Sequence, residues 1–193
     1  MRFLPKLTAI LRESSDVLLK LAALDCVDQI SEKFGKNDKI AIANAAEVVS
    51  SVQCLGNADN RLCALALLCL ASMVEVLNQS IIPVLPEALQ RAFEHLQKSI
   101  EEDTESERLH NAVYSFVGAL LMHVPWMLTG GYLDSILKLS HESSNADMGE
   151  SCDHNREETL QLLAKQINVK DLFVSLERNW SSAVTEGPQV RTP

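Results

Sequence analysis

Aromatic residues are scarce in this sequence, and so are glycine and proline. Phe, Trp and Tyr make up 5% of the 193 residues, and the chain has only seven glycines and six prolines. Because 47% of the residues are nevertheless apolar, the interior must be built mainly from Leu, Ala, Val and Ile, which suit helices. The composition therefore predicts an all-α protein.

Positive charge is also in short supply. The chain has 17 Lys and Arg against 26 Asp and Glu, a formal net charge of -9. The excess of acid falls in residues 61–140 and 141–193, each with five basic and nine acidic residues. Such a surface repels phosphates, and it lacks the basic patch with which a domain binds nucleic acid directly. Protein partners are the better expectation for this segment.

Targeting and membrane signals are missing as well. The opening residues have no long apolar region followed by a small-residue cleavage site, which argues against a signal peptide. The five cysteines are odd in number, and free thiols indicate a reducing compartment such as the cytosol or nucleus. The most apolar stretch, residues 62–77, is shorter than the roughly twenty residues of a membrane span.

This stretch, LCALALLCLASMVEVL, organises the rest of the chain. Only Ser72 and Glu75 are clearly polar, and apolar residues occupy every side of a helical wheel. A helix that is apolar all round must be covered all round. We therefore expect a central core helix in which Leu68 is also buried.

Helical patterns on both sides of it repeat the same arrangement. Residues 21–27, 65–71 and 112–118 align as second helices of hairpins, with offsets of 44 and 47 residues. The first helices repeat too, because Leu-Pro at 4–5 and at 85–86 opens a Leu-rich helix each time. Helix pairs that recur every 40–47 residues are typical of HEAT or armadillo arrays, in which each pair covers the apolar face of the next.

The pattern predicts an α-solenoid of four to five HEAT-like antiparallel helix pairs over residues 1–184. Ile40 and Val52 belong to the predicted inward face of one helix, and residues 132–139 form a short helix. Residues 141–155 are predicted to form an exposed loop because they are almost entirely polar. Beyond this loop the pattern predicts one more helix pair, and residues 185–193 form a frayed tail.

Several stretches carry a likeness to a known family. They are KLAALD at 20–25, CLG at 54–56, DNRL at 59–62, LLCLASMVEVL at 67–77, IPVLP at 82–86, LHNAVY at 109–114 and GYLDSIL at 131–137. Together they resemble the U-three small nucleolar RNA-associated protein ten family, the large nucleolar HEAT-repeat proteins of the small-subunit processome. The likeness covers roughly residues 3–184 and is to one internal segment, since members of that family are very long solenoids.

The resemblance implies a scaffold role in ribosome biogenesis, in the nucleolus of the nucleus. Family members join the pre-ribosomal particle early and support processing of the ribosomal RNA precursor and transcription of ribosomal RNA. The implied partners are other processome proteins, with small nucleolar RNA and pre-rRNA bound through the whole assembly rather than through this acidic segment. The alternative is a generic α-solenoid adaptor, of the transport or phosphatase-scaffold type.

Residues typical of catalysis and ligand binding do not form a convincing site. Cys152, His154 and His141 are the nearest approach to a metal cluster, but the second close pair of ligands that zinc sites use is absent. The chain has no phosphate-binding glycine loop and no oriented nucleophile and base. We therefore expect no enzymatic activity, cofactor, metal, small-molecule ligand or membrane.

Two aromatic residues are candidate partner contacts. Trp126 and Tyr132 flank the Gly130–Gly131 pair at a helix connection, where an exposed aromatic side chain could anchor a partner. The alternative interpretation, which we prefer, is that they pack against the neighbouring repeat.

Overall fold

The computed structural model describes residues 2–101, 107–146 and 148–185, and within these ranges all regular secondary structure is helical. The α-helices are α1 (Leu4–Glu13), α2 (Val17–Phe34), α3 (Lys39–Val49), α4 (Asn60–Leu77), α5 (Leu85–Glu101), α6 (Glu107–His123), α7 (Gly131–Ser144), α8 (Glu150–Gln166) and α9 (Val169–Thr185). Short 3-10 turns lie at Gly35–Asn37, Asn78–Val84 and Pro125–Met127. The all-α prediction is confirmed for the described residues.

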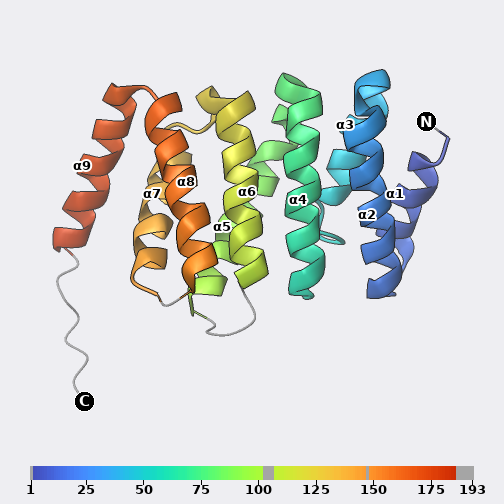
Figure 1. The fold of residues 1–193 in the computed structure, drawn as a ribbon, viewed down its shortest axis with the longest axis horizontal. Coiled ribbons are helices and arrows are strands. Elements are labelled where there is room, and N and C mark those ends of the chain that lie inside the picture. Colours follow the sequence, from blue (N-terminus) through green and yellow to red (C-terminus); the bar gives the residue numbers. More distant parts are fainter. Residues whose placement is uncertain (1, 102–106, 147, 186–193) are drawn as a thin grey trace, which may run out of the picture.

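The helices stand in two rows. Helices α2, α4, α6 and α8 lie side by side in the front row of Figure 1, and each packs against the next. In the second row, α1 packs on α3, α5 on α7, and α7 on α9. Figure 1 shows α5 and α7 behind the front row and α9 at the left end. The stretches aligned at offsets of 44 and 47 residues lie in α2, α4 and α6, and the two Leu-Pro dipeptides open α1 and α5. Equivalent helices of the repeat therefore occupy the same row.

Helix α4 packs between α2 and α6 in the front row and against α3 of the second row. The Asp59 carboxylate caps its first turn by accepting hydrogen bonds from the amides of Arg61 (2.9 Å) and Leu62 (3.3 Å). The helical run Asn60–Glu101 contains a window of mean hydropathy 1.8 that meets the length and composition of a membrane span. Half of that window is buried within the protein, as is common for core helices.

One side of α4 is open, which corrects the expectation of all-round cover. Leu68 is 42% exposed, whereas Leu67 and Leu70 on either side of it are fully buried. Ile40 of α3 and Val52 in the following turn were also predicted to face inward, and both are exposed. The reason is that a helix within two rows has neighbours on three sides, so its fourth side meets solvent whatever residues it carries.

The predicted loop at 141–155 is wrong over most of its length. Helix α7 continues to Ser144 and α8 begins at Glu150, so the connection between them comprises only residues 145–149. Most described side chains of this segment are exposed or half-buried, while Ser143 and Cys152 are buried. The polar composition therefore indicated solvent exposure but not the backbone, because a polar segment can be helical when a few of its side chains pack on neighbouring helices. Similarly, the short helix predicted at 132–139 is part of the longer α7.

The C-terminal helices are arranged differently from the predicted final pair. Helix α8 packs on α6, while α9 packs on α7 in the other row. Exposed apolar side chains remain on α9, and Trp180 is 75% exposed. Helix α9 extends to Thr185, and the rest of the predicted tail, residues 186–193, lies outside the described residues.

Candidate interaction surfaces

A groove of about 380 Å³ lies in the front row over α6, between α4 and α8. Its floor carries small side chains, among them Ala71 of α4 and Ser115 and Gly118 of α6. Met122 of α6 and Leu162 of α8 add apolar atoms at its sides. The groove exists because small residues at matching positions of adjacent helices leave a depression between them.

Gly118 sets the depth of the groove. It lies within α6, and a Cβ atom added there would meet a single neighbour within 4 Å, Thr159 Oγ1 at 3.9 Å. The space above Gly118 is therefore open rather than filled by another helix. Met122, which lines the groove, is 59% exposed, and the exposed Leu68 lies one helical turn before Ser72 on α4, so the depression has an apolar margin.

The charges at the groove are negative. Within the described part of the chain, the charged residues that line it are Glu75 of α4 and Glu158 of α8, both exposed. Glu158 Oε1 lies 3.4 Å from His154 Nε2 on the same helix. Next to the groove, Asp28 of α2 interacts with Ser72, and burial raises the pKa of the Asp28 carboxyl group although the hydrogen bond from Ser72 opposes the shift.

A cluster of polar side chains is buried between α6, α7 and α8. His110 Nε2 of α6 lies 2.6 Å from Ser143 Oγ of α7, and Arg156 Nη1 of α8 donates to the same oxygen over 3.4 Å. One helical turn further on, the Tyr114 hydroxyl donates to Ser140 Oγ over 3.1 Å. The cluster thus ties three helices together through side chains.

The histidine of this cluster is kept neutral at pH 7. Burial lowers the pKa of His110 to about 4, and the positive charge of Arg156 acts in the same direction. Its ring lies 4.9 Å from that of Tyr114, and Nδ1 has no hydrogen-bond partner among the described residues. Because His110 is fully buried, no substrate reaches it, and we assign it a structural role.

Trp126 and Tyr132 are separated by the structure. Trp126 lies in the 3-10 turn before α7 and is 52% exposed. Tyr132 is half-buried in the first turn of α7, and its ring centroid lies 6.5 Å from that of Phe93 on α5. Tyr132 therefore packs on α5, whereas Trp126 is exposed. A partner contact through either residue stays a prediction.

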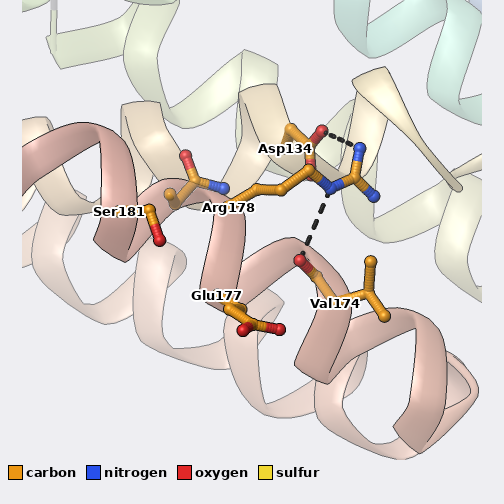
Figure 2. Close-up of a pocket in the computed structure, with 6 residues that line it drawn as sticks. Asp134, Val174, Glu177, Arg178 and Ser181 are labelled. Atoms are coloured by element: carbon orange, nitrogen blue, oxygen red, sulfur yellow. Dashed lines mark hydrogen bonds and ion pairs between the residues drawn. The ribbon is translucent and has the colours of Figure 1, made fainter.

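Another hollow, of about 600 Å³, lies at the junction of α7 and α9 (Figure 2). Arg178 of α9 crosses it and places Nη1 2.8 Å from Asp134 Oδ2 of α7. Ser175 of α9 donates a hydrogen bond to the other oxygen of Asp134. These contacts fix α9 on α7, so we interpret the hollow as a joint between the helices rather than a ligand site.

The residues of the candidate metal cluster do not come together. Among the described residues, no group of three or more His, Cys, Asp and Glu side chains could hold a metal ion. Cys152 is buried, with its thiol against the Glu107 carbonyl oxygen at 3.8 Å, whereas His154 is exposed and faces Glu158. Burial raises the pKa of Cys152 to about 11, so its thiol is a poor metal ligand and nucleophile at neutral pH.

The groove was missed at the sequence level, although a signal for it was present. The repeat alignment matches Ala71 with Gly118, so two successive repeats carry a small residue at the same position. A pair of small residues in register on adjacent helices indicates either close helix packing or a surface depression. The structure shows a depression, because a Cβ atom added at Gly118 would meet Thr159 Oγ1 alone, at 3.9 Å.

Comparison with known proteins finds relatives that match nearly the whole chain. A Coccidioides immitis protein named U3 small nucleolar RNA-associated protein 10 is 52% identical over 185 residues, which is 96% of this chain and 10% of that protein. Proteins of the same name from Aspergillus niger and Neurospora crassa are each 46% identical, again over 96% of this chain and 10% of their own length.

No protein-family model and no solved structure matches the chain. The chain spans about a tenth of the length of the curated relatives that it matches. Identity of 46–52% over nearly two hundred aligned residues leaves no doubt about common ancestry of the aligned part. The chain thus corresponds, over nearly all of its length, to one segment of the U3 small nucleolar RNA-associated protein 10 family.

Proposed function

We propose that this chain is a non-enzymatic scaffold segment in ribosome biogenesis, acting within a small-subunit processome component in the nucleolus. The observation that carries the proposal is the 52% identity with a protein whose name states its association with U3 small nucleolar RNA. The proposed roles of the whole protein are processing of the ribosomal RNA precursor and support of ribosomal RNA transcription.

The architecture that we propose for the segment is an α-solenoid of HEAT-like helix pairs. Two features support it: equivalent helices stack in the same row at the 44- and 47-residue offsets, and each of α2, α4, α6 and α8 packs on the next. In the other row, α1 packs on α3, α5 on α7 and α7 on α9, and the turn Asn78–Val84 packs on both α3 and α5. In such an array one amphipathic pair covers its neighbour, and the outer sides of the rows remain free for partners.

The proposed partners are other processome proteins. The net charge of -9 disfavours direct contact with RNA, so we propose that small nucleolar RNA and pre-rRNA are held through the full assembly. A site for a metal, a cofactor, a small molecule or a membrane forms no part of the proposal. The second candidate function is a generic solenoid adaptor, which the acidic surface would also suit if its cargo were basic.

A segment exchange tests the proposal. In Neurospora crassa, the matching segment of the 46% identical relative is replaced by this chain, and a second strain carries a deletion of the segment. We expect the exchanged protein to localise to the nucleolus and to co-purify U3 small nucleolar RNA and processome proteins, while the deletion loses processome proteins.

The same experiment separates the two candidate functions. An exchanged protein that accumulates at the normal level, yet recovers neither U3 RNA nor processome proteins, would overturn the scaffold proposal. Recovery of transport cargo or phosphatase subunits in their place would favour the adaptor.

A further inference from the structure

We propose that the groove between α4, α6 and α8 binds a basic amphipathic helix of a partner protein. This inference rests on the proposed function in one respect, namely that the partners of the segment are proteins, and it adds the place and the chemistry of one contact. Three properties of the groove carry it: its floor, its margin and its charge.

The floor and margin suit the apolar side of a helix. Small side chains at Ala71, Ser115 and Gly118 leave the depression open. The exposed side chains of Leu68 and Met122 stand close to it. Covering these side chains removes apolar surface from water, which favours binding, and an apolar residue of the partner inserted over Gly118 would fill the depression.

The helical surface itself favours a helix over an extended peptide. An extended peptide gains affinity when its backbone pairs with an open sheet edge. The described residues contain no strand, and the backbone groups of α4, α6 and α8 are already paired within each helix. A partner helix satisfies its own backbone and needs only side-chain contacts, which is what the groove offers.

The negative charges at the groove favour a positively charged partner. Glu75 and Glu158 lie on opposite sides of the groove, on α4 and α8, and no Lys or Arg in the described part of the chain lines it. Asp28 adds a further carboxylate beside Ser72. Lys or Arg residues flanking the apolar stripe of the partner helix would reach both rims, and RNA would be repelled.

The test uses the purified chain and a synthetic peptide. The probe is a fluorescein-labelled amphipathic helix of about 18 residues, five turns long, built from Leu, Ala and Lys with the leucines on one side. One control peptide has Glu in place of Lys, and another has the same composition in a scrambled order. We expect fluorescence anisotropy to show saturable binding of the amphipathic Lys peptide that weakens as salt is added.

Two protein variants locate the binding. Gly118→Leu fills the floor at a helical position where an added Cβ atom would meet Thr159 Oγ1 alone, at 3.9 Å. The double variant Glu75→Lys with Glu158→Lys reverses the charge on both sides of the groove. Each is expected to weaken binding about tenfold, whereas Glu13→Lys, at the exposed end of α1 in the other row, should leave it unchanged. Circular dichroism confirms that every variant is folded.

The possible outcomes decide between this proposal and its alternatives. Equal binding by the wild type and both groove variants, or binding of the scrambled peptide as tight as that of the amphipathic one, overturns the proposal. So does tighter binding of a single-stranded RNA oligonucleotide that the groove variants abolish. The segment exchange could fail while the peptide binds with the expected variant effects. That result would overturn the proposed function and leave the groove assignment standing.

Discussion

His110 of α6 and Ser143 of α7 are joined by a 2.6 Å hydrogen bond, and both side chains are fully buried. The bond links two helices that are separate along the chain, and Arg156 of α8 donates to the same serine. Asp153, on α8, pairs with Arg156 at 2.7 Å. The packing of α6, α7 and α8 therefore depends on a histidine that must stay uncharged.

The first prediction concerns pH. Burial lowers the pKa of His110 to about 4 in the folded state, against about 6.5 in an unfolded chain. The unfolded state therefore binds the proton first, and stability falls as the pH drops from about 6.5 toward 4. We expect the free energy of unfolding in urea to decrease by about 2 kcal/mol between pH 7 and pH 5.

The control for this prediction is His110→Gln, which keeps a polar group of similar reach but does not titrate. It should be less stable than the wild type at pH 7 and should show a smaller decrease between pH 7 and pH 5. The same decrease in both proteins would show that His110 is not responsible.

A second prediction compares adjacent positions on α4. Leu67 is fully buried, so Leu67→Asp places an unpaired charge in the core and should unfold the protein at a cost of several kcal/mol. Leu68 is 42% exposed, and Leu68→Asp should be tolerated with a melting temperature close to that of the wild type. Thermal unfolding monitored by circular dichroism checks both. Unfolding of both variants would mean that the open side of α4 is covered in solution.

A third prediction tests the cap of α4. Asp59 binds the Arg61 side chain, with Arg61 Nη2 2.7 Å from Oδ2, and accepts from two backbone amides. We expect Asp59→Ala to lower the stability by about 1 kcal/mol and Asp59→Asn, which retains an accepting oxygen, to lower it less. Urea unfolding at pH 7 measures both.

The cap also predicts a pH effect of its own. The hydrogen bond from Arg61 and those from the backbone amides lower the pKa of Asp59 in the folded state. The stabilisation is therefore complete above the ordinary carboxyl pKa of about 3.9 and is lost as the pH falls through the lowered value. The alanine variant should lack this loss at acid pH.

A fourth prediction concerns thiol reactivity. Burial raises the pKa of Cys54, Cys63 and Cys152 to about 11 and raises that of Cys69 well above its ordinary value, while Cys26 is exposed. Iodoacetamide should therefore label Cys26 of the native protein quickly and the other four slowly. Mass spectrometry after a short reaction time identifies the labelled cysteines, and in urea all five should react equally fast.

A fifth prediction concerns association of the isolated chain. Exposed apolar side chains at Val169, Phe173, Leu176 and Trp180 recur along α9 at helical spacing. We expect this stripe to cause concentration-dependent self-association. Phe173→Ser with Trp180→Ser should reduce it, while Met122→Ser on α6 should not. Sedimentation velocity distinguishes these outcomes, and a wild-type chain that stays monomeric at all concentrations would contradict the prediction.

Much of the fold could be predicted from local patterns. Helix positions follow from apolar periodicity, and the N-cap role of Asp59 follows from its place before an apolar run. Periodicity could not show that Leu68, Ile40 and Val52 lie on open sides, because which side of a helix lacks a neighbour is decided by the arrangement of the rows.

The polar features were harder to predict. The segment 141–155 has the composition of a loop, and only tertiary contacts reveal that Ser143 bonds His110 and that Cys152 is buried. The groove combines residues from α4, α6 and α8, so no local window of the sequence contains it. Only the repeat alignment, which places Ala71 and Gly118 in register, points toward it.

The two rows have a kinetic consequence. Because the described helices pack mainly on their neighbours along and across the rows, the protein can lose an end without losing its middle. Amide hydrogens of α4 and α6 should exchange with solvent only when most of the structure opens, while those of α1 and α9 exchange through local detachment. The ends are thus the parts that are free to rearrange when a neighbouring element docks against them.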